Sequence, residues 1–382
     1  MRILILHAYS SENAGDGLLV EETMNVLVES VDEAIEFTIL ASYPETFGNL
    51  DATVLRSRPT SRGYSSKYLI ELWTLGSYDL VVGVGGGYLR AGHFTESVKM
   101  ALVHGPQILA AALARVPTIY MPQSIGPNKG IFGKLMKSAV GKIGTVYVRD
   151  DRSFRELDLP NVTRIADLAI LTGSRVDMPQ TEVEGRPVLS IRPIRGRIPP
   201  PVSELAAMLG DFDGYSQSDT AGNSDSDAMR SLQPYSMLSR EDLMDPARTA
   251  LPRVVVAVRL HAALMAMRAG HFVIHLAYER KGFGAFEDMG LDEFVHNVNR
   301  FEPERVVRQV RLLLTSHEAR ADYERRFVQG FGQARENKLQ LTDAVHRAAS
   351  NSETKIRALG DATSAVTSPP YGLVNGAPEE SA

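Results

Sequence analysis

Short apolar runs alternate with helical patterns along the first half of the chain. The runs that predict strands cover residues 2–7, 36–40, 78–84, 116–121, 145–148 and, more weakly, 163–166. The stretches between them that predict helices cover residues 18–31, 96–115, 130–142 and 151–157. Continuous apolar strands separated by helices are typical of parallel sheets that are buried on both faces.

A second series of the same kind begins at Arg186. Its predicted strands cover residues 187–192, 253–258 and 272–277, and its predicted helices cover 202–209, 260–268, 302–328 and 331–349. Two parallel α/β halves joined by a short linker leave a cleft between the carboxyl ends of their strands. We therefore predict an α/β protein with two Rossmann-like domains that face a cleft, residues 1–175 and 186–349.

Two segments lack periodicity. Residues 211–227 are rich in Gly, Ser and Asp, which is typical of a mobile loop. Residues 350–382 are rich in Ser, Thr, Pro, Ala and Gly, and this composition predicts a disordered C-terminal tail.

Composition narrows the class of protein. The chain has 382 residues, 44% hydrophobic and 23% charged, as expected for ordinary globular domains. A net charge of −5 argues against a protein held on nucleic acid by bulk charge. There is no cysteine, and the nine histidines form no His-x-x-x-His pair on a predicted helix, so we predict neither a metal site nor a bound cofactor.

The first apolar run, residues 3–6, is too short for a secretory segment or a membrane span. We expect a cytoplasmic protein, and a loose association with a membrane surface is compatible with this pattern. The sequence does not decide the oligomeric state.

Glycine-rich turns follow two of the N-terminal strands. Asn13, Gly15 and Asp16 open the first predicted helix, where free N–H groups attract anions; a tight turn with a capping Asp is the alternative. Gly85, Gly86 and Gly87 end the third strand, where they permit either close approach of a ligand or close helix–strand packing. Neither turn has the spacing of a Walker or dinucleotide-binding loop.

Polar side chains lie at the predicted carboxyl ends of further strands. Gln123 offers neutral hydrogen bonding beside a Gly-Pro turn. Arg149 ends a strand from which it could reach the cleft, although a salt bridge to Asp150, Asp151 or a neighbour is the commoner fate of such an arginine.

The second half carries more charge at its strand ends. Arg192 and Arg195 follow its first strand, and planar guanidinium groups suit carboxylate or phosphate. Arg259 stands where the strand at 253–258 stops, and His261 lies in the first turn of the next helix, whose positive end disfavours an imidazolium. Tyr278 and Lys281 follow the next strand.

Taken in order, these residues resemble the polysaccharide pyruvyl transferase family, from about residue 1 to about residue 345. The features that carry the resemblance are Asn13-Ala14-Gly15-Asp16, Gly85-Gly86-Gly87, Gln123 with Ile125-Gly126-Pro127, Arg149-Asp150 with Ser153, Asp167 with Ala169, Ser190-Ile191-Arg192, Arg259-Leu260-His261 and Ala277-Tyr278-Glu279-Arg280-Lys281. The chain departs from the family pattern at 211–234, where Gln217 is a candidate for a missing glutamine, and at 270–273, where a proline is absent.

The resemblance implies a two-domain fold similar to glycosyltransferases of the GT-B type. It implies transfer of pyruvate from phosphoenolpyruvate onto two hydroxyls of a sugar in a cell-surface glycan or lipid-linked saccharide, as a cyclic ketal, with release of phosphate. It also implies that Arg259 and His261 belong to the donor site, with Arg192 matching a family arginine, and that the N-terminal half supplies the acceptor side.

The chemistry of the residues agrees with this expectation. Arginine is a natural clamp for a small molecule with a phosphate and a carboxylate, and a near-neutral imidazole can serve as acid or base. We expect Arg259 and His261 to be catalytic, with Arg192, Arg195, Tyr278 and Lys281 at the donor. A GT-B nucleotide-sugar glycosyltransferase, a glycan-binding or sugar-phosphate-binding protein without activity, and an inactive family member remain alternatives; nucleotide diphosphate binding separates the first from the rest.

Overall fold

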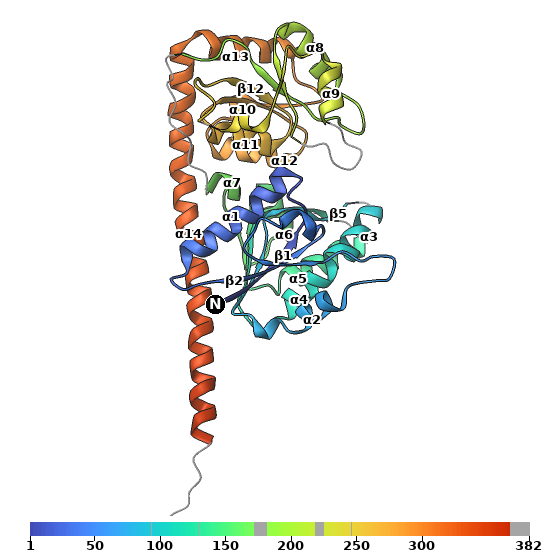
Figure 1. Cartoon of the computed structure of the whole chain (residues 1–382), viewed down its shortest axis with the longest axis vertical. Coiled ribbons are helices and arrows are strands. Elements are labelled where there is room, and N and C mark those ends of the chain that lie inside the picture. Colours follow the sequence, from blue (N-terminus) through green and yellow to red (C-terminus); the bar gives the residue numbers. More distant parts are fainter. Residues whose placement is uncertain (93, 129, 172–181, 218–224, 246, 367–382) are drawn as a thin grey trace, which may run out of the picture.

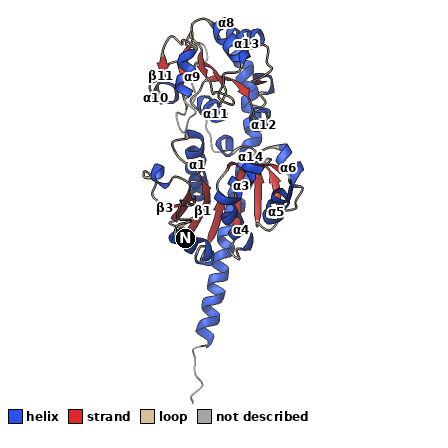
Figure 2. Cartoon of the chain, turned by 90° about the vertical axis from the view of Figure 1, so that its right-hand side faces the viewer, coloured by secondary structure: helices blue, strands red, loops and turns tan. Residues whose placement is uncertain are grey.

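The computed structural model describes the chain apart from residues 93, 129, 172–181, 218–224, 246 and 367–382. Its strands form two separate sheets, one above the other in Figure 2. All strand pairs between named strands are parallel, as the continuous apolar runs predicted.

The N-terminal sheet has eight strands in the order β3-β2-β1-β4-β6-β7-β8, with β5 paired to β6. Their bounds are β1 Arg2–Ala8, β2 Glu36–Ala41, β3 Thr53–Arg56, β4 Leu80–Gly83, β5 Gly86–Ala91, β6 Thr118–Asn128, β7 Thr145–Val148 and β8 Val162–Arg164. Its helices are α1 Ala14–Ser30, α2 Ser66–Trp73, α3 Phe94–Val103, α4 Gly105–Leu113, α5 Gly130–Val140, α6 Asp151–Leu157 and α7 Leu168–Leu171, with short 3₁₀ turns at Pro44–Phe47 and Leu75–Ser77.

The C-terminal sheet has six strands in the order β11-β10-β9-β12-β13-β14. Their bounds are β9 Val188–Ser190, β10 Asp213–Tyr215, β11 Met237–Leu238, β12 Val254–Ala257, β13 Phe272–Ala277 and β14 Val295–Asn297. Its helices are α8 Pro200–Leu209, α9 Asp225–Ser231, α10 Arg240–Met244, α11 Leu260–Arg268, α12 Arg280–Asp288, α13 Pro303–Thr315 and α14 His317–Val366, with a 3₁₀ turn at Asp292–Phe294.

Some predicted elements differ from those in the structure. The helix predicted over 96–115 is divided into α3 and α4, because Pro106 in the first turn of α4 lacks the N–H that a continuous helix would use. The break predicted near residue 330 lies at Ser316 instead, whose side chain accepts a hydrogen bond from the Ala319 N–H and caps α14.

Helix α14 connects the two halves. It runs beside both sheets in Figure 1, and its side chains contact the N-terminal half: Lys338 pairs with Glu29 at 2.7 Å, and Asn337 accepts a hydrogen bond from the Ala166 N–H. The last helix of the predicted domain 186–349 therefore packs partly on the first half. The helix also extends to Val366, within the segment 350–382 that we predicted to be disordered.

The prediction of a mobile loop over residues 211–227 is wrong at both ends of the segment. It supplies strand β10 and the first residues of α9, and only residues 218–224 lie outside the described part. Both elements are too short, and too rich in Asp and Ser, to show a period in the sequence.

Candidate functional site

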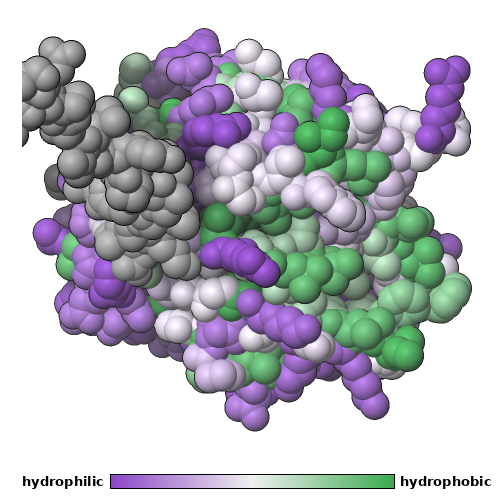
Figure 3. Space-filling model, turned by 90° about the horizontal axis from the view of Figure 1, so that it is seen from below, coloured by the Kyte–Doolittle hydropathy of each residue, from purple (hydrophilic) through white to green (hydrophobic). Residues whose placement is uncertain are grey.

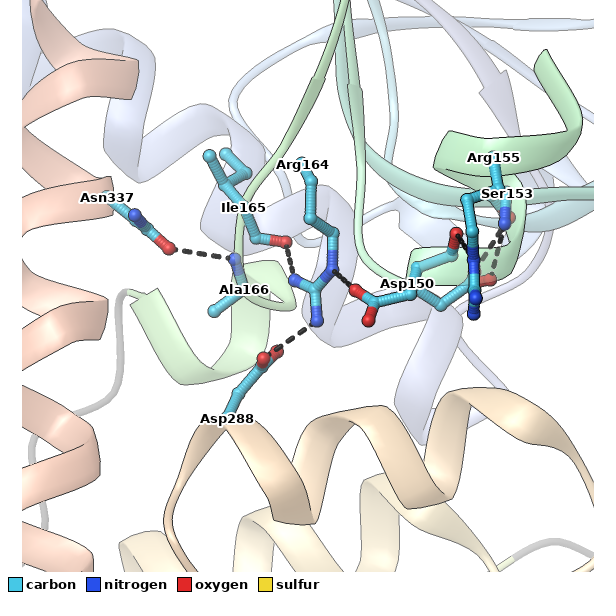
Figure 4. A network of polar contacts seen from close by, with 9 residues as sticks. Asp150, Ser153, Arg155, Arg164, Ile165, Ala166, Asp288 and Asn337 are labelled. Carbon is cyan, nitrogen blue, oxygen red and sulfur yellow. Dashed lines mark hydrogen bonds and ion pairs between the residues drawn. The ribbon is translucent and has the colours of Figure 1, made fainter. Parts of the chain in front are cut away.

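The carboxyl ends of the two sheets face each other, and contacts cross between the halves at this edge. An added Cβ at Gly15 of α1 would collide with the imidazole of His261 in α11, so only glycine fits there. Arg164 at the end of β8 donates to Asp288 of α12 at 2.7 Å, and Figure 4 shows this side chain pointing across the gap between the ribbons of the two halves. The predicted cleft is therefore closed by direct contacts along part of its length.

His261 lies at the centre of this junction. Burial, aided by the nearby charges of Lys281, Arg149 and Arg259 and opposed by that of Asp167, lowers its pKa to about 3. Its Nε2 atom is buried and has no hydrogen-bond partner among the described residues. At neutral pH the side chain is thus an uncharged imidazole with an unused nitrogen, as its position in the first turn of α11 predicted.

Arg259 lies directly before α11, and its guanidinium group already forms an ion pair. Its Nε and Nη2 atoms lie 2.5 and 2.9 Å from the two carboxylate oxygens of Asp225 in α9, and Asp225 is fully buried. This bidentate pair leaves Nη1 as the part of the guanidinium that it does not engage. The sequence did not predict the partner, because Asp225 lies in the segment that we had predicted to be a mobile loop.

Arg149 approaches His261 from the N-terminal half. It is almost fully buried, donates from Nε to Ser124 at 3.2 Å and pairs through Nη1 with Asp167, while its buried Nη2 has no partner. Burial raises the pKa of Asp167, but Arg149, His261 and a backbone N–H outweigh it and leave that pKa lowered. The alternative reading of Arg149 as a salt-bridge residue is correct, with Asp167 as the partner in place of Asp150 or Asp151.

Gln123 and the glycines at 85–87 are uncharged residues that the N-terminal half brings to this junction. Gln123 on β6 is fully buried, and neither end of its amide has a hydrogen-bond partner among the described residues. An added Cβ at Gly87 would lie 3.7 and 3.8 Å from Nη2 of Arg90 and of Arg149, so this glycine borders two guanidinium groups. Gly85 serves packing instead, since its Cβ would lie 2.8 Å from the Pro122 carbonyl, and Gly86 begins β5.

The turn before α1 holds a carboxylate of its own. Asn13 is the N-cap: its Oδ1 accepts from the Gly15 N–H, and its Nδ2 donates to Asp16 at 2.6 Å. Burial raises the pKa of Asp16, and Lys281, Asn13, Arg149 and Arg259 oppose the rise. Asp16 therefore faces cations from both halves.

A cavity of about 220 Å³ lies beside this junction, between the ends of β6 and β13. It is lined by Arg90, Ser124, Gly126, Pro127, Asp150, Ser153, Tyr278, Glu279, Arg280 and Lys281. Glu279 pairs with both Arg90 and Lys281 at 3.1 Å, and their charges hold its pKa at about 2 against the opposing effect of burial. Sequence reasoning singled out neither residue as a site residue: Arg90 lies inside β5, and Glu279, the N-cap residue of α12, carries the same charge as the expected donor.

The remaining predicted donor residues divide into two groups. Arg192 donates to the Tyr278 hydroxyl at 2.6 Å, so these two side chains lie together at the cavity. Arg195 is exposed in a turn with φ = 53°, and no contact to the other predicted site residues was found for it. Gln217 is buried, and its Oε1 atom has no hydrogen-bond partner among the described residues, which leave out the adjacent residues 218–224.

Within the described residues, no group of three or more His, Asp or Glu side chains is placed to hold a metal ion.

Comparison with solved structures defines the class of fold. The O-GlcNAc transferase of Thermobaculum terrenum superposes with a TM-score of 0.51 at 16% identity, over 93% of this chain and 69% of that one. A structure assigned to a UDP-N-acetylglucosamine 2-epimerase of Listeria monocytogenes superposes with a TM-score of 0.54 at 11% identity, over 98% and 99%. The chain has the two-sheet GT-B architecture that the hydrophobic pattern and the resemblance predicted.

A family model identifies the protein more closely. The model of the polysaccharide pyruvyl transferase family matches residues 13–204, half of the chain, and the chain belongs to this family. Membership makes it a transferase that acts on polysaccharides. No curated protein sequence matches the chain.

Proposed function

We propose that this protein transfers the pyruvyl group of phosphoenolpyruvate onto two hydroxyls of a sugar in a cell-surface glycan or glycolipid, forming a cyclic ketal and releasing phosphate, without a cofactor. The observation that carries the proposal is the unpartnered Nε2 of His261 beside the unpartnered Nη2 of Arg149. A neutral base and a free guanidinium edge are what a reaction of hydroxyl groups with a small anion requires.

Donor binding would use the cations around the cavity. Phosphoenolpyruvate carries a phosphate and a carboxylate on three carbons, and each charge-assisted hydrogen bond to them contributes about 1.5–3 kcal/mol. Arg149 offers Nη2, and Arg259 offers Nη1. Lys281 and Arg90 both pair with the carboxylate of Glu279. An anionic donor would compete with this carboxylate for the two cations.

The proton transfers would centre on His261. As one sugar hydroxyl attacks C2, its proton passes to the neutral imidazole, and the imidazolium delivers a proton to C3 as the CH₂ group becomes CH₃. The second hydroxyl then forms the second C2–O bond while the C2–phosphate bond breaks, and its proton leaves with the phosphate. A bound trianionic donor favours the imidazolium, so donor binding would raise the pKa of His261 from its low value.

The amide of Gln123 and the turn at Asn13 would face the sugar acceptor. Both ends of the Gln123 amide are buried and unpartnered, which suits a hydroxyl that can donate and accept. We place the reaction in the cytoplasm, where phosphoenolpyruvate is made, on a finished or a lipid-linked saccharide.

Thermal unfolding tests the donor. Phosphoenolpyruvate at millimolar concentration should raise the unfolding midpoint of the wild-type protein, and a nucleotide diphosphate should not. Lys281→Ala is the variant to compare with the wild type in this experiment. It removes a cation, while Glu279, the carboxylate that Lys281 pairs with, keeps its pair with Arg90. Arg259→Ala would also remove the ion pair with the buried Asp225, so a lost response could come from a changed fold as well as from a lost donor contact. A response to the nucleotide diphosphate alone would assign the protein to the nucleotide-sugar glycosyltransferases.

A further inference from the structure

An apolar surface covers one face of the N-terminal half, on α2, α4 and α5. Its exposed side chains, which we call the α4 face, are Leu69, Trp73, Leu109, Leu113 and Leu135. Trp73 is 91% exposed and Leu113 66% exposed. Figure 3 shows hydrophobic side chains gathered over one part of the molecule seen from below. Large apolar side chains in such a group mark an interaction surface.

Two shallow grooves make the α4 face continuous. One groove, of about 420 Å³, runs between α4 and α5, and the other, of about 590 Å³, runs between α4 and α2. Leu109 and Leu113 line both grooves. Helix α4 is therefore a ridge with an apolar hollow on each side.

The charges around the α4 face are mostly positive. Residues 97–148 contain six lysines or arginines and no Asp or Glu, in a chain whose net charge is −5. Lys142 lines the first groove and Arg115 the second, and Lys134 is exposed on α5. On α2, Glu71 accepts a hydrogen bond from the Tyr78 hydroxyl at 2.6 Å, and Lys67 is exposed.

We propose that the α4 face docks on the surface of a lipid bilayer that contains anionic lipids. Apolar side chains enter the boundary of the acyl chains, while surrounding lysines and arginines meet anionic head groups. A second copy of the chain is a poor occupant. A two-fold interface would bring the same patch against itself, and residues 97–148 offer no carboxylate to pair with its cations.

The α4 face is connected to the candidate site. Gly126 and Pro127, near the end of strand β6, line the cavity between the halves, and α5 begins at Gly130. Ile131 in the first turn of α5 is exposed, so apolar surface continues toward the edge where the site lies. The described residues contain no helix that is both long and apolar enough to cross a membrane. Docking concerns location alone and does not rest on the proposed chemistry.

Vesicle co-sedimentation of the full chain tests the proposal. We expect binding to vesicles of phosphatidylcholine with phosphatidylglycerol, weaker binding at high salt, and little binding to phosphatidylcholine alone. Leu109→Ser with Leu113→Ser should weaken binding more than tenfold, because two leucines leave the acyl boundary. Lys134→Gln with Lys142→Gln should weaken it roughly fivefold for each lysine, since each contributes about 1 kcal/mol.

Leu312→Ser is the matched control, because Leu312 is 54% exposed on α13, outside the α4 face. It should bind vesicles as the wild type does. Circular dichroism and the unfolding midpoint without ligand check that each variant is folded.

The proposal is overturned by the absence of vesicle binding, or by equal binding of the Leu109/Leu113 variant and the wild type. Light scattering after gel filtration, without lipid, tests whether a second copy of the chain covers the α4 face instead. A dimer that the leucine substitutions dissociate would assign the α4 face to a second copy.

Discussion

Arg149 and Arg259 each lie just after the carboxyl end of a strand in one of the two halves, and the comparison shows what each half brings to the junction. Each follows a short, buried parallel strand, β7 or β12, and each pairs with a buried aspartate from another segment, Asp167 after Arg149 in the chain and Asp225 before Arg259. The Arg149 side chain is 1% exposed and that of Arg259 is 12% exposed. Both guanidinium groups lie close enough to His261 to lower its pKa.

The two pairs differ in what they leave free. Asp225 takes a full edge of Arg259, so that this guanidinium is fixed by two hydrogen bonds. Asp167 engages only Nη1 of Arg149, whose Nη2 stays buried without a partner. An unsatisfied buried donor is costly unless a ligand pairs with it. We therefore propose that the N-terminal half also contacts the donor, where the resemblance had implied only the acceptor side.

The largest expected effect comes from the imidazole between the two arginines. His261→Ala should lower turnover about 10²–10⁴-fold, because it removes the proposed acid and base. Donor binding should persist, since the cations remain. Phosphate release and the donor-induced thermal shift measure the two quantities separately, and unchanged turnover would refute the role of His261.

Replacing either arginine tests whether its ion pair with a buried aspartate stabilises the fold. Arg149→Met should cost about 3–5 kcal/mol in the free energy of unfolding, because it leaves Asp167 buried and unpaired. Arg259→Met should cost less if water reaches Asp225 past the more exposed arginine. Urea unfolding measures both.

The control for Arg259→Met is the double variant with Asp225→Asn, which removes the stranded charge and should recover most of the loss. No recovery would mean that Arg259 stabilises the fold through contacts other than Asp225.

Gly15 tests the contact between the halves. Gly15→Ala places a methyl group into the His261 ring, and overpacking of this kind costs about 1–3 kcal/mol in stability or displaces the imidazole with loss of turnover. Gly48→Ala is the matched control, since an added Cβ there meets nothing within 4 Å. Equal behaviour of the two variants would show that the halves move apart at this point.

The last prediction is the pH dependence of stability, which compares buried histidines in the two halves. Burial lowers the pKa of His104 to about 3 and of His275 to about 4, as it does that of His261. The unfolded chain, with histidine pKa near 6.5, binds protons that the folded chain does not. Stability should therefore be complete above about pH 6.5 and fall at lower pH, by about 1.4 kcal/mol per pH unit for each such histidine.

Urea unfolding at pH 7 and pH 5 measures how the free energy of unfolding depends on pH. His261→Gln should reduce this dependence by about 1.4 kcal/mol per pH unit, the contribution of one histidine. A wild-type stability that is unchanged between these pH values would contradict the burial of all three side chains.

Much of the fold followed from the sequence, because parallel strands buried on both faces leave continuous apolar runs that need no partner to be recognised. Strands β1, β2, β4, β6 and β7 and helix α11 lie where the pattern predicted them. Strand β3 and helix α2 were missed, since β3 lies at the sheet edge with half-exposed side chains and α2 exposes Leu69, Ile70 and Trp73 against the usual pattern.

The sequence by itself determined which residues stand at the strand ends, including Arg149, Arg259 and His261, because the position of a residue after an apolar run is a local property. Only the tertiary structure decided the partners. Asp225 and Asp167 face these arginines, and Gly15 meets His261, because segments up to 246 residues apart in number come together at one edge of two sheets. Hydrogen bonding and burial depend on that meeting, which no single stretch of sequence encodes.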